Sequence, residues 1–343
     1  MKVLHVLNTG KISGAENVAS DICMMFKDEF EMAYCSRQGS IREALDARGV
    51  KFLPISNLTV KELARVVEEF SPDLIHAHDV RATVVASRLS LPFISHLHVN
   101  NDDMKKITLK ALLYRMTAKK AKKIIAVSDS CLNDYIFASA IKNKTVVMNN
   151  IIYSRRLEKL TETAVPEKIF DFLFLGRLVD QKNPQRVARV AAGVLKKRPT
   201  SSFAVIGEGD LKAQMEAIFI EAGVNDRVVF TGNLASPYGI LKNARCLLFC
   251  SRFEGTPIAA LEAMFFGVPI VSTPTDGLLR LIEHEQTGYL WDQDEDLIKS
   301  ILRLIDDQAC FREIALASHE RFKVLNQEGT YHDQLKAIYQ SIK

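Results

Sequence analysis

Short apolar runs alternate with amphipathic stretches along the whole chain. In the first 150 residues, seven apolar runs predict strands at 2–8, 31–36, 51–56, 73–78, 92–98, 122–128 and 145–150. The pattern restarts near residue 169, with further runs at 170–176, 202–207, 227–232, 246–251 and 269–273. Between the runs, apolar residues recur at helical spacing. Strands that are apolar on both faces and separated by helices are typical of parallel sheets covered by helices on both sides.

The restart of the pattern divides the chain into two domains. Residues 154–168 are polar and charged and are suited to a linker. We therefore predict a first domain over residues 1–165 and a second over residues 166–325, facing one another across a cleft. The expected fold class is α/β, with a Rossmann-like, doubly wound parallel sheet in each domain. Helical patterns follow the last strand, and we expect residues 326–343 to form a helix that crosses back to the first domain.

Composition and charge narrow the class of protein. The 343 residues are 48% hydrophobic and 25% charged, as in soluble globular proteins. We find no apolar run of membrane-spanning length, no signal-peptide pattern and no CxxC pair among the six cysteines, so we expect a cytoplasmic protein with buried thiols. Residues 1–165 carry 24 Lys and Arg against 18 Asp and Glu, whereas residues 166–343 carry 21 against 23. The two halves should therefore bind different partners.

The strand ends of the second half carry a basic loop. The run at 170–176 ends with Gly176 and Arg177, and Lys182 follows five residues later. Ligands of open parallel sheets bind beyond the carboxyl ends of the strands. Arg offers a planar fork and Lys a mobile point charge, so this pair suits a diphosphate. Gly207 ends the next strand, where the missing side chain lets a ligand approach the backbone.

Two glutamates spaced E-x7-E follow the strand at 246–251. Glu254 lies in the loop after the strand, and Glu262 lies on an otherwise apolar helix. The predicted helix start lies between them, at Gly255, Thr256, Pro257 and Ile258. We expect Thr256 to cap this helix and Pro257 to occupy its first position, so that its N-terminus can attract an anion. Such glutamate pairs also arise by chance. Because Glu262 is surrounded by apolar residues on its helix, its carboxylate is either buried and paired or turned toward a ligand.

The strand ends of the first half carry glycines and histidines. A loop with Gly10 and Gly14 follows the first strand and leads into Glu16, without the GxGxxG spacing of dinucleotide-binding loops. Four histidines end two later strands: His76, His78, His96 and His98. Strand alternation puts each pair on one face. A zinc cluster is conceivable, but no carboxylate or cysteine at a matching spacing supports it.

Together, these residues resemble the GT-B glycosyltransferases, specifically the large retaining family 4. The resemblance covers essentially the whole chain. It rests on the segments SGAE (13–16), HAHD (76–79), HLHV (96–99), AVSDS (126–130), FLGRL with QKNP (174–184), EGTPIAALEAMFFGVP (254–269) and HEQTGYLW (284–291). The segment at 254–269, with both glutamates, and the Arg177 and Lys182 spacing are the most specific of these features.

For the second domain, the resemblance implies a site for a nucleoside-diphosphate sugar. Arg177 and Lys182 would hold the diphosphate, Glu254 would contact the sugar hydroxyls, and Glu262 would accept from the ribose. The other implied donor-binding positions are Gly14, Gly176, Gly207, Gly255, Thr256, Pro257 and Ile258. The resemblance further implies a hexosyl- or N-acetylhexosaminyltransferase that uses a UDP-linked donor to build a cell-surface polysaccharide.

For the first domain, the resemblance implies the acceptor side of the site. His98 would lie beside the donor sugar, and Glu16 and His78 would face a glycan or lipid-linked acceptor. The implied catalytic residues are His98, Arg177, Lys182 and Glu254.

The chemistry required is departure of a nucleoside diphosphate from an anomeric carbon. Because charge builds on the diphosphate, fixed cations and helix N–H groups are the main catalytic devices. Arg177 and Lys182 can supply them without a metal, and we expect no cofactor beyond the donor substrate. The family retains the anomeric configuration, and we see no convincing covalent nucleophile, so front-face displacement is our hypothesis.

The sequence departs from the family pattern in two places. The family often has Asn-Gly after the last strand of the first domain, where this chain has Asn149-Asn150. The loop before residues 284–291 usually reads Gly-Gly-x-x-Glu, but here Asp276 replaces the first Gly and Arg280 replaces the Glu. The contacts of that loop with the donor sugar, and hence the sugar, cannot be taken from relatives.

Residues 105–123 predict a basic amphipathic helix. Eight Lys and Arg surround an apolar side formed by Ile107, Leu109, Leu112, Leu113 and Met116. This pattern fits either a solvated helix with an ordinary core face or a helix that docks on anionic lipid at the inner face of the membrane. Nucleic-acid binding is not expected, because no base-stacking motif accompanies the charge.

Two other functions fit the same residues. A sugar-nucleotide epimerase on the same fold would bind the same donor and need no acceptor. A non-enzymatic module would bind a nucleotide sugar or a lipid without turnover.

Overall fold

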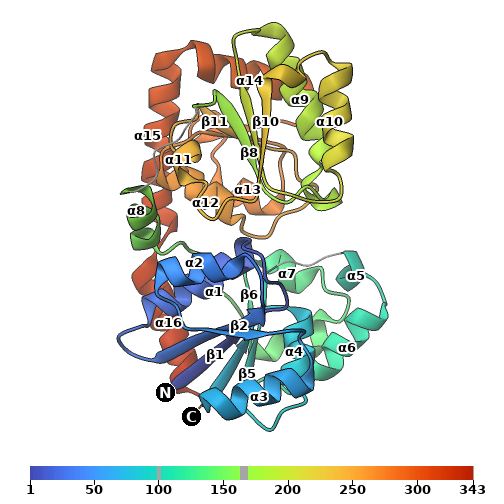
Figure 1. Ribbon diagram of the computed structural model, residues 1–343, viewed down its shortest axis with the longest axis vertical. Helices are drawn as coiled ribbons and strands as arrows, with labels where there is room; N and C mark the ends of the chain where they lie inside the picture. Colours follow the sequence, from blue (N-terminus) through green and yellow to red (C-terminus); the bar gives the residue numbers. More distant parts are fainter. Residues whose placement is uncertain (99–101, 163–168, 343) are drawn as a thin grey trace. The chain divides into compact units, whose positions relative to one another are not determined.

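The structure, a computed structural model, describes residues 1–98, 102–162 and 169–342, which form two compact units (Figure 1). The first unit contains Met1–Tyr153 and is completed by the chain from Gln327 onward. The second unit is Ser154–Asn326. The predicted boundary at 165/166 lies outside the described residues. Helix α16 (Glu328–Gln340) belongs to the first unit. In this helix, His332 Nε2 lies 2.7 Å from Glu29 Oε1, and the His332 ring stacks on the Phe26 ring.

The first unit is built on a seven-stranded parallel sheet. Its strand order is β3-β2-β1-β4-β5-β6-β7. The strands are β1 (Lys2–Val6), β2 (Glu31–Arg37), β3 (Phe52–Ile55), β4 (Leu74–Ala77), β5 (Phe93–Leu97), β6 (Lys123–Ala126) and β7 (Thr145–Val147). The helices besides α16 are α1 (Gly14–Met25), α2 (Ile41–Arg48), α3 (Val60–Phe70), α4 (Val80–Ala86), α5 (Asp102–Lys105), α6 (Leu109–Ala118) and α7 (Asp129–Asn133). The buried apolar faces of these elements form the core of the unit.

The second unit repeats the architecture with a six-stranded parallel sheet. Its strand order is β10-β9-β8-β11-β12-β13. The strands are β8 (Phe172–Leu175), β9 (Phe203–Ile206), β10 (Val228–Gly232), β11 (Cys246–Phe249), β12 (Ile270–Ser272) and β13 (Gly288–Leu290). The helices are α8 (Ser154–Glu162), α9 (Pro184–Lys197), α10 (Lys212–Glu221), α11 (Tyr238–Leu241), α12 (Ile258–Phe265), α13 (Asp276–Leu281), α14 (Asp294–Asp306) and α15 (Gln308–Leu325). The predicted fold class, two doubly wound α/β domains, is confirmed.

Three local predictions were wrong. Residues 154–162 form helix α8 rather than a linker, because Arg, Leu, Glu and Lys favour helix and Leu157 is fully buried. The helix predicted over 105–123 is interrupted at Thr108, whose Oγ1 accepts from Ala111 N at 3.1 Å and which thereby caps the start of α6. Strand β13 is missing from the predicted strands, since three residues are too few to show a period.

Two further observations limit the class of protein. All six cysteines are buried, as expected. No described helix is both long enough and apolar enough to cross a membrane.

Candidate functional site

In both sheets the order of strands reverses between two neighbours, β1 and β4 in the first unit and β8 and β11 in the second. The loops that leave such a pair run in opposite directions and open a crevice where ligands of this architecture bind. In the second unit these loops are residues 176–183 and 250–257. In the first unit they are residues 7–13 and 78–79. The predicted site residues gather on these four loops and on the elements beside them.

Lys182 and Glu254 join the two loops of the second unit. Lys182 Nζ donates to Glu254 Oε1 at 2.6 Å, and Ser251 Oγ donates to the same oxygen at 2.6 Å. Both charged side chains are mostly buried, so water screens their attraction only weakly. The ammonium group also lies 6.0 Å from the centre of the Phe249 ring. Two residues predicted as catalytic are therefore in direct contact, and Ser251 is a partner that the sequence did not reveal.

Arg177 is tied to the same pair of loops through Gln181. The exposed Arg177 guanidinium donates to Gln181 Oε1 at 3.3 Å, and Gln181 Nε2 donates to the Phe253 carbonyl at 3.2 Å. Arg177 and Lys182 thus lie on one short loop whose geometry depends on a glutamine. The sequence analysis missed Gln181 because a neutral amide gives no charge signal.

Gly207 and Gly277 are positions where the backbone leaves no room for a side chain. A Cβ on Gly207, which has a φ of +138°, would collide with the Gly176 carbonyl oxygen. A Cβ on Gly277 would collide with the Gly255 carbonyl oxygen, and Gly277 N donates to Glu254 O at 3.2 Å. Gly207 therefore packs the strand ends closely, whether or not it also contacts a ligand.

Helix α12 starts one residue later than predicted. Ile258 is its first residue, and Pro257 is the N-cap residue with an extended backbone (φ −71°, ψ 113°), without a side-chain cap. Thr256 therefore lies one position before the cap rather than at it. The helix ends before Gly267, which has a φ of +64°.

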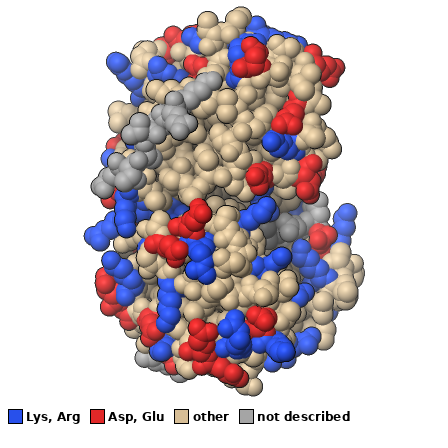
Figure 2. Space-filling view, in the orientation of Figure 1, with Lys and Arg blue, Asp and Glu red and all other residues tan. Residues whose placement is uncertain are grey.

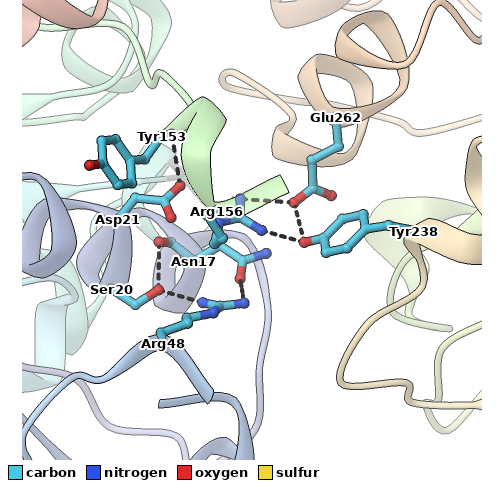
Figure 3. Close-up of polar contacts among 8 residues, drawn as sticks. All are labelled: Asn17, Ser20, Asp21, Arg48, Tyr153, Arg156, Tyr238 and Glu262. Carbon is cyan, nitrogen blue, oxygen red and sulfur yellow. Dashed lines mark hydrogen bonds and ion pairs between the residues drawn. The ribbon is translucent and has the colours of Figure 1, made fainter. Parts of the chain in front are cut away.

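Glu262 is buried in α12 and paired within the second unit (Figure 3). Its Oε1 lies 3.1 Å from Arg156 Nη2 and accepts from Tyr238 Oη at 2.9 Å. Arg156 Nη1 also donates to Tyr238 Oη, which closes a triangle. A buried carboxylate needs such compensation. Of the two possibilities left open by the sequence, the structure shows the buried and paired one. Arg156 was missed because residues 154–168 were taken as a linker.

The residues that depart from the family pattern interact with each other. Arg280 Nη2 donates to Asp276 Oδ1 at 3.4 Å across one turn of α13. An ion pair of this kind on an exposed helix contributes little to stability. The pair places a cation and an anion together beside Gly277. In the usual family pattern, a glutamate stands at the position of Arg280.

In the first unit, the glycine loop packs against its neighbours. Helix α1 begins at Gly14 after the N-cap residue Ser13, whose hydroxyl donates to the Glu16 carboxylate. Glu16 is buried, so its position is fixed by this local contact. A Cβ on Gly10 would collide with the carbonyl oxygens of Arg37 and Gln38. Gly10 therefore serves close packing of two loops.

Polar side chains on α1 hold the neighbouring helix α2 and the end of the segment Met1–Tyr153 (Figure 3). Arg48 Nη2 donates to Asn17 Oδ1 at 2.9 Å, and Arg48 Nη1 donates to Ser20 Oγ. Asp21 Oδ2 accepts from the backbone N–H of Tyr153 at 3.3 Å. These contacts fix the helix that follows the glycine loop.

Five histidines fill the middle of the first sheet and form two hydrogen-bonded rows. In one row, His5 Nδ1 lies 2.8 Å from His78 Nε2, and His78 Nδ1 lies 3.0 Å from His98 Nε2. In the other, His76 Nδ1 lies 2.8 Å from Tyr339 Oη, and His76 Nε2 lies 3.2 Å from His96 Nδ1. The rows stack on each other at centroid distances of 4.2 Å (His76–His78) and 4.1 Å (His96–His98). His5 and Tyr339 were missed because they lie far from the other histidines in the sequence.

Burial keeps these imidazoles neutral. It lowers the pKa of His5 and of His98 to about 3, and it lowers the pKa of His76, His78 and His96 well below the usual value. Neighbouring imidazoles add to the effect for the last three, because one positive ring disfavours another.

By proximity alone, two groups of three could hold a metal ion: His5, His76 and His78, and His78, His96 and His98. The row geometry favours hydrogen bonds instead. Rings His78 and His98 are nearly coplanar, with an interplanar angle of 19°, and their centroids are 5.2 Å apart for a nitrogen separation of 3.0 Å. The two nitrogens therefore face each other directly. A zinc ion between them would need about 4 Å, twice its usual bond to histidine. These residues do not fit a metal in this arrangement.

Asp79, which ends the HAHD segment, starts helix α4. Its carboxylate accepts from Ala82 N at 2.7 Å and from Asn8 N at 2.9 Å, across the β1–β4 crevice. Burial raises the pKa of this carboxyl, and the backbone hydrogen bonds oppose that shift.

Comparison with known families matches nearly the whole chain. Residues 12–155 match the family model described as Glycosyltransferase Family 4, and residues 156–322 match the model described as Glycosyl transferases group 1. The chain belongs to glycosyltransferase family 4. The resemblance stated from the sequence motifs is confirmed.

Individual relatives of this glycosyltransferase are distant. It is 22% identical to a UDP-Gal:alpha-D-GlcNAc-diphosphoundecaprenol alpha-1,3-galactosyltransferase of Escherichia coli, over 90% of this chain and 89% of that protein. It is 24% identical to a lipopolysaccharide 1,6-galactosyltransferase of Salmonella typhimurium, over 90% and 91%. An uncharacterized glycosyltransferase of Methanocaldococcus jannaschii is 25% identical over 62% of this chain and 58% of that protein.

Solved structures establish the fold class of this glycosyltransferase as GT-B. HepE from Anabaena in complex with UDP-glucose aligns over 99% of this chain and 100% of that chain, with a TM-score of 0.85 and 22% identity. At that identity the likeness shows the fold alone.

Proposed function

We propose that this glycosyltransferase moves a hexose or N-acetylhexosamine from a UDP-linked donor to a glycan or lipid-linked acceptor during synthesis of a cell-surface polysaccharide. The observation that carries the proposal is the Lys182–Glu254 contact at the reversal point of the second sheet. It holds a buried ammonium group where an anionic ligand of this architecture binds. The names of the two galactosyltransferase relatives and of the HepE complex support UDP sugars and polysaccharide or lipopolysaccharide acceptors.

In the proposed reaction, the bond between the anomeric carbon and the diphosphate oxygen breaks, and its electrons leave with the diphosphate. Lys182 and Arg177 stabilise the negative charge that develops there. The acceptor hydroxyl oxygen bonds to the anomeric carbon from the same face, and its proton passes to the departing diphosphate oxygen. The configuration is therefore retained, and these residues meet the need for positive charge without a metal or cofactor.

The proposed donor contacts are those that the family resemblance implies. A diphosphate competes with Glu254 for Lys182 and so releases the Glu254 carboxylate toward sugar hydroxyls. Glu262 would contact the ribose only if the ribose hydroxyls share or displace its contacts with Arg156 and Tyr238. The backbone of Gly176, Gly255, Thr256, Pro257 and Ile258 lines the approach to the phosphates. In the first unit, Glu16, His78 and His98 would face the acceptor, His98 would also lie beside the donor sugar, and Gly14 would approach the donor.

The experiment is a transfer assay with a panel of UDP, GDP and ADP sugars and an undecaprenyl-diphosphate-linked acceptor. We expect acceptor-dependent release of UDP and a product whose anomeric proton shows the donor's configuration by NMR. EDTA should leave the rate unchanged. A product with inverted configuration or a requirement for a metal would contradict the proposed mechanism but not the proposed transferase activity.

The same assay separates the other functions. Conversion of a UDP sugar to its epimer without acceptor would show an epimerase. Saturable binding of a nucleotide sugar without turnover, with any acceptor, would show a binding module.

We further propose that residues 105–123 attach the enzyme to anionic lipid on the cytoplasmic side of the membrane. The side of α6 that packs on the core consists of Ala111, Tyr114, Thr117 and Ala118. The large apolar residues lie outward, with Ile107 exposed by 73%, Leu109 by 74% and Met116 by 68%. Lysines and Arg115 surround them, and Figure 2 shows basic side chains gathered over this part of the first unit. Apolar side chains ringed by cations fit an anionic bilayer surface.

Vesicle sedimentation tests this surface. We expect binding to phosphatidylglycerol vesicles, little binding to phosphatidylcholine vesicles, and weakening by salt. Leu109→Glu should lower the partition coefficient at least tenfold. Leu316→Glu is the matched control, because Leu316 is a helical leucine of the second unit exposed by 65%. Equal losses in both variants would contradict the proposed surface.

A further inference from the structure

One cavity of the first unit lies at the amino ends of strands β5 and β6. It has a volume of about 530 Å³ and opens between the loop from α4 to β5, the turn from α6 to β6 and the segment after α16. Its walls include Ser87, Ser90, Leu91, Lys120, Lys122 and Ile342. The crevice described above lies beyond the carboxyl ends of the strands of this sheet, so the cavity is separate from it.

The charge of the cavity walls is entirely positive. Lys120 and Lys122 line the cavity, and none of the residues that line it is acidic. Neither lysine forms an ion pair with a residue that the structure describes, and the contact of Lys120 Nζ with the Ser87 carbonyl at 3.4 Å leaves the charge in place. At the other end of the same segment, by contrast, Lys105 and Lys110 each lie within 3.3 Å of an aspartate oxygen. The positive charge at the cavity is therefore available to an anion from outside the protein.

The backbone that carries the two lysines is held in place on both sides. Lys144 Nζ donates to the carbonyl oxygens of the residues before and after Lys120, at 2.6 and 3.1 Å. Lys122 N donates to the carbonyl of Phe93, the first residue of β5, at 2.9 Å. Only the two side chains therefore need to be ordered when an anion binds, which lowers the entropic cost of binding.

The cavity continues the outward apolar face of α6. Leu109, Leu112 and Met116 follow one another at spacings of three and four residues, so they share one face of this helix. Lys120 follows four residues beyond Met116, which is about 6 Å along the helix direction. Apolar side chains also line the cavity beside the lysines. An amphiphilic anion can therefore contact the apolar face and the two ammonium groups at the same time.

We propose that this cavity binds the phosphate group of an anionic phospholipid, with Lys120 and Lys122 as the cations that hold it. The inference rests on the membrane surface proposed for residues 105–123 and assigns to it one specific lipid contact. The phosphate oxygens accept charge-assisted hydrogen bonds from both ammonium groups, and the hydroxyl of Ser90, which also lines the cavity, can donate another. The apolar walls cover the first carbons of the lipid chains.

NMR of the full chain with ¹³C-labelled Leu and Ile methyl groups tests the site without a membrane. The probe is dihexanoylphosphatidylglycerol, kept below the concentration at which it forms micelles. We expect saturable shifts of the methyl signals of Leu89, Leu91 and Ile342, which line the cavity. Dihexanoylphosphatidylcholine, which has no net charge, should leave these signals in place. Equal shifts with both lipids, or shifts with neither, would overturn the proposal.

A soluble phosphate separates the two sources of the same chemistry. sn-Glycerol 3-phosphate carries a phosphate group but no apolar chain, so it cannot use the apolar walls of the cavity. We expect it to bind about tenfold more weakly than dihexanoylphosphatidylglycerol, or more weakly still. Equal or tighter binding of glycerol phosphate would assign the cavity to a soluble phosphate compound and overturn the lipid assignment.

Two double variants test the lysines at equal net charge. Lys120→Gln with Lys122→Gln should weaken the binding of dihexanoylphosphatidylglycerol about tenfold or more. Lys106→Gln with Lys119→Gln removes the same charge from two exposed lysines of the segment that do not line the cavity, and it should change the affinity less than about twofold. Equal losses in both variants would show general electrostatic attraction and no site. Because the lipid is dissolved and no donor is present, failure here leaves the vesicle and transfer assays to be decided separately.

Discussion

The two units share an architecture but fill the same place in it with different chemistry. Both have a parallel sheet whose strand order reverses between two neighbours. In the first unit the residues at this point are neutral imidazoles joined in rows, such as His78 and His98. In the second they are paired charges, Lys182 with Glu254 and Arg156 with Glu262. The hydrogen bonds of the first group depend on which imidazole nitrogens carry protons, whereas the second group depends on the pairing of opposite charges.

Under the proposed function, these two kinds of polar site would serve two different substrates. Paired charges suit a donor that brings a diphosphate, because the anion can replace a carboxylate as partner of the ammonium group. Neutral rings with directed N–H groups suit an uncharged sugar, whose hydroxyls need hydrogen bonds rather than charge. The two units should therefore respond differently to pH and to the removal of a charge.

Acid should destabilise the first unit by the largest amount. Burial lowers the pKa of all five histidines in the rows below that of the unfolded chain, so the unfolded state binds more protons from about pH 6.5 down to the folded pKa, about 3 for His98. The free energy of unfolding therefore falls as the pH falls through this window. Between pH 7 and 5.5 each histidine contributes about 1 kcal/mol, and the five together several kcal/mol. Hydrogen exchange of the full chain, read by mass spectrometry, measures each unit separately.

The second unit is the control for the acid experiment. Its histidines are His284 and His319, and neither joins such a row in the described ranges. Its exchange protection should change far less between pH 7 and 5.5. Equal loss of protection in both units would show that the histidine rows are not the cause.

Breaking the buried ion pair should have the next largest effect, confined to the second unit. Arg156→Met removes the cation beside Glu262, and both side chains are buried. An uncompensated buried carboxylate costs about 3–5 kcal/mol of stability. Urea unfolding of the variant measures this loss of stability. Arg198→Met, at an exposed pair with Asp306, should cost at most about 1 kcal/mol.

A double variant sharpens this test. If the loss comes from the unpaired charge, Arg156→Met with Glu262→Leu should recover most of the stability lost in Arg156→Met. A double variant no more stable than the single one would assign the loss to packing around Tyr238 instead.

The sequence predicted the histidine rows of the first unit and the charged pairs of the second unit unequally well. Strand alternation put His76 with His78 and His96 with His98, because the period of a strand is fixed. The partners that complete the rows, His5 and Tyr339, come from distant segments that only the folded chain brings together. The topology of both sheets followed from apolar runs, which report burial directly.

In the second unit, charge and spacing identified Lys182 and Glu254 but not their connections. Gln181 and Ser251 were missed because neutral polar residues are common in loops and give no pattern. Arg156 was missed because residues 154–168 were predicted to be a linker, although residues 154–162 form α8, which tertiary contacts hold in place.

Removing the Lys182 charge should affect turnover more than stability. Lys182→Ala removes the ammonium group proposed to stabilise the departing diphosphate, and we expect kcat to fall about 10²–10³-fold. Lys212→Ala is the matched control, since that lysine forms an exposed pair with Glu216 in the same unit. Steady-state release of UDP measures both. If Lys182→Ala raises KM and leaves kcat unchanged, the charge binds the donor without assisting its departure.

The smallest effect tests a charged side chain of the first unit, at the crevice beside the neutral histidine rows. Asp79 accepts from Ala82 N as the cap of α4 and from Asn8 N across the β1–β4 crevice. Asp79→Ala should cost about 1 kcal/mol, as the loss of a helix cap does. Asp79→Asn keeps an oxygen acceptor and removes the charge, and urea unfolding should show it nearly as stable as the original protein. If Asp79→Asn loses as much stability as Asp79→Ala, the negative charge itself is required. The first unit would then depend on charge compensation as the second does.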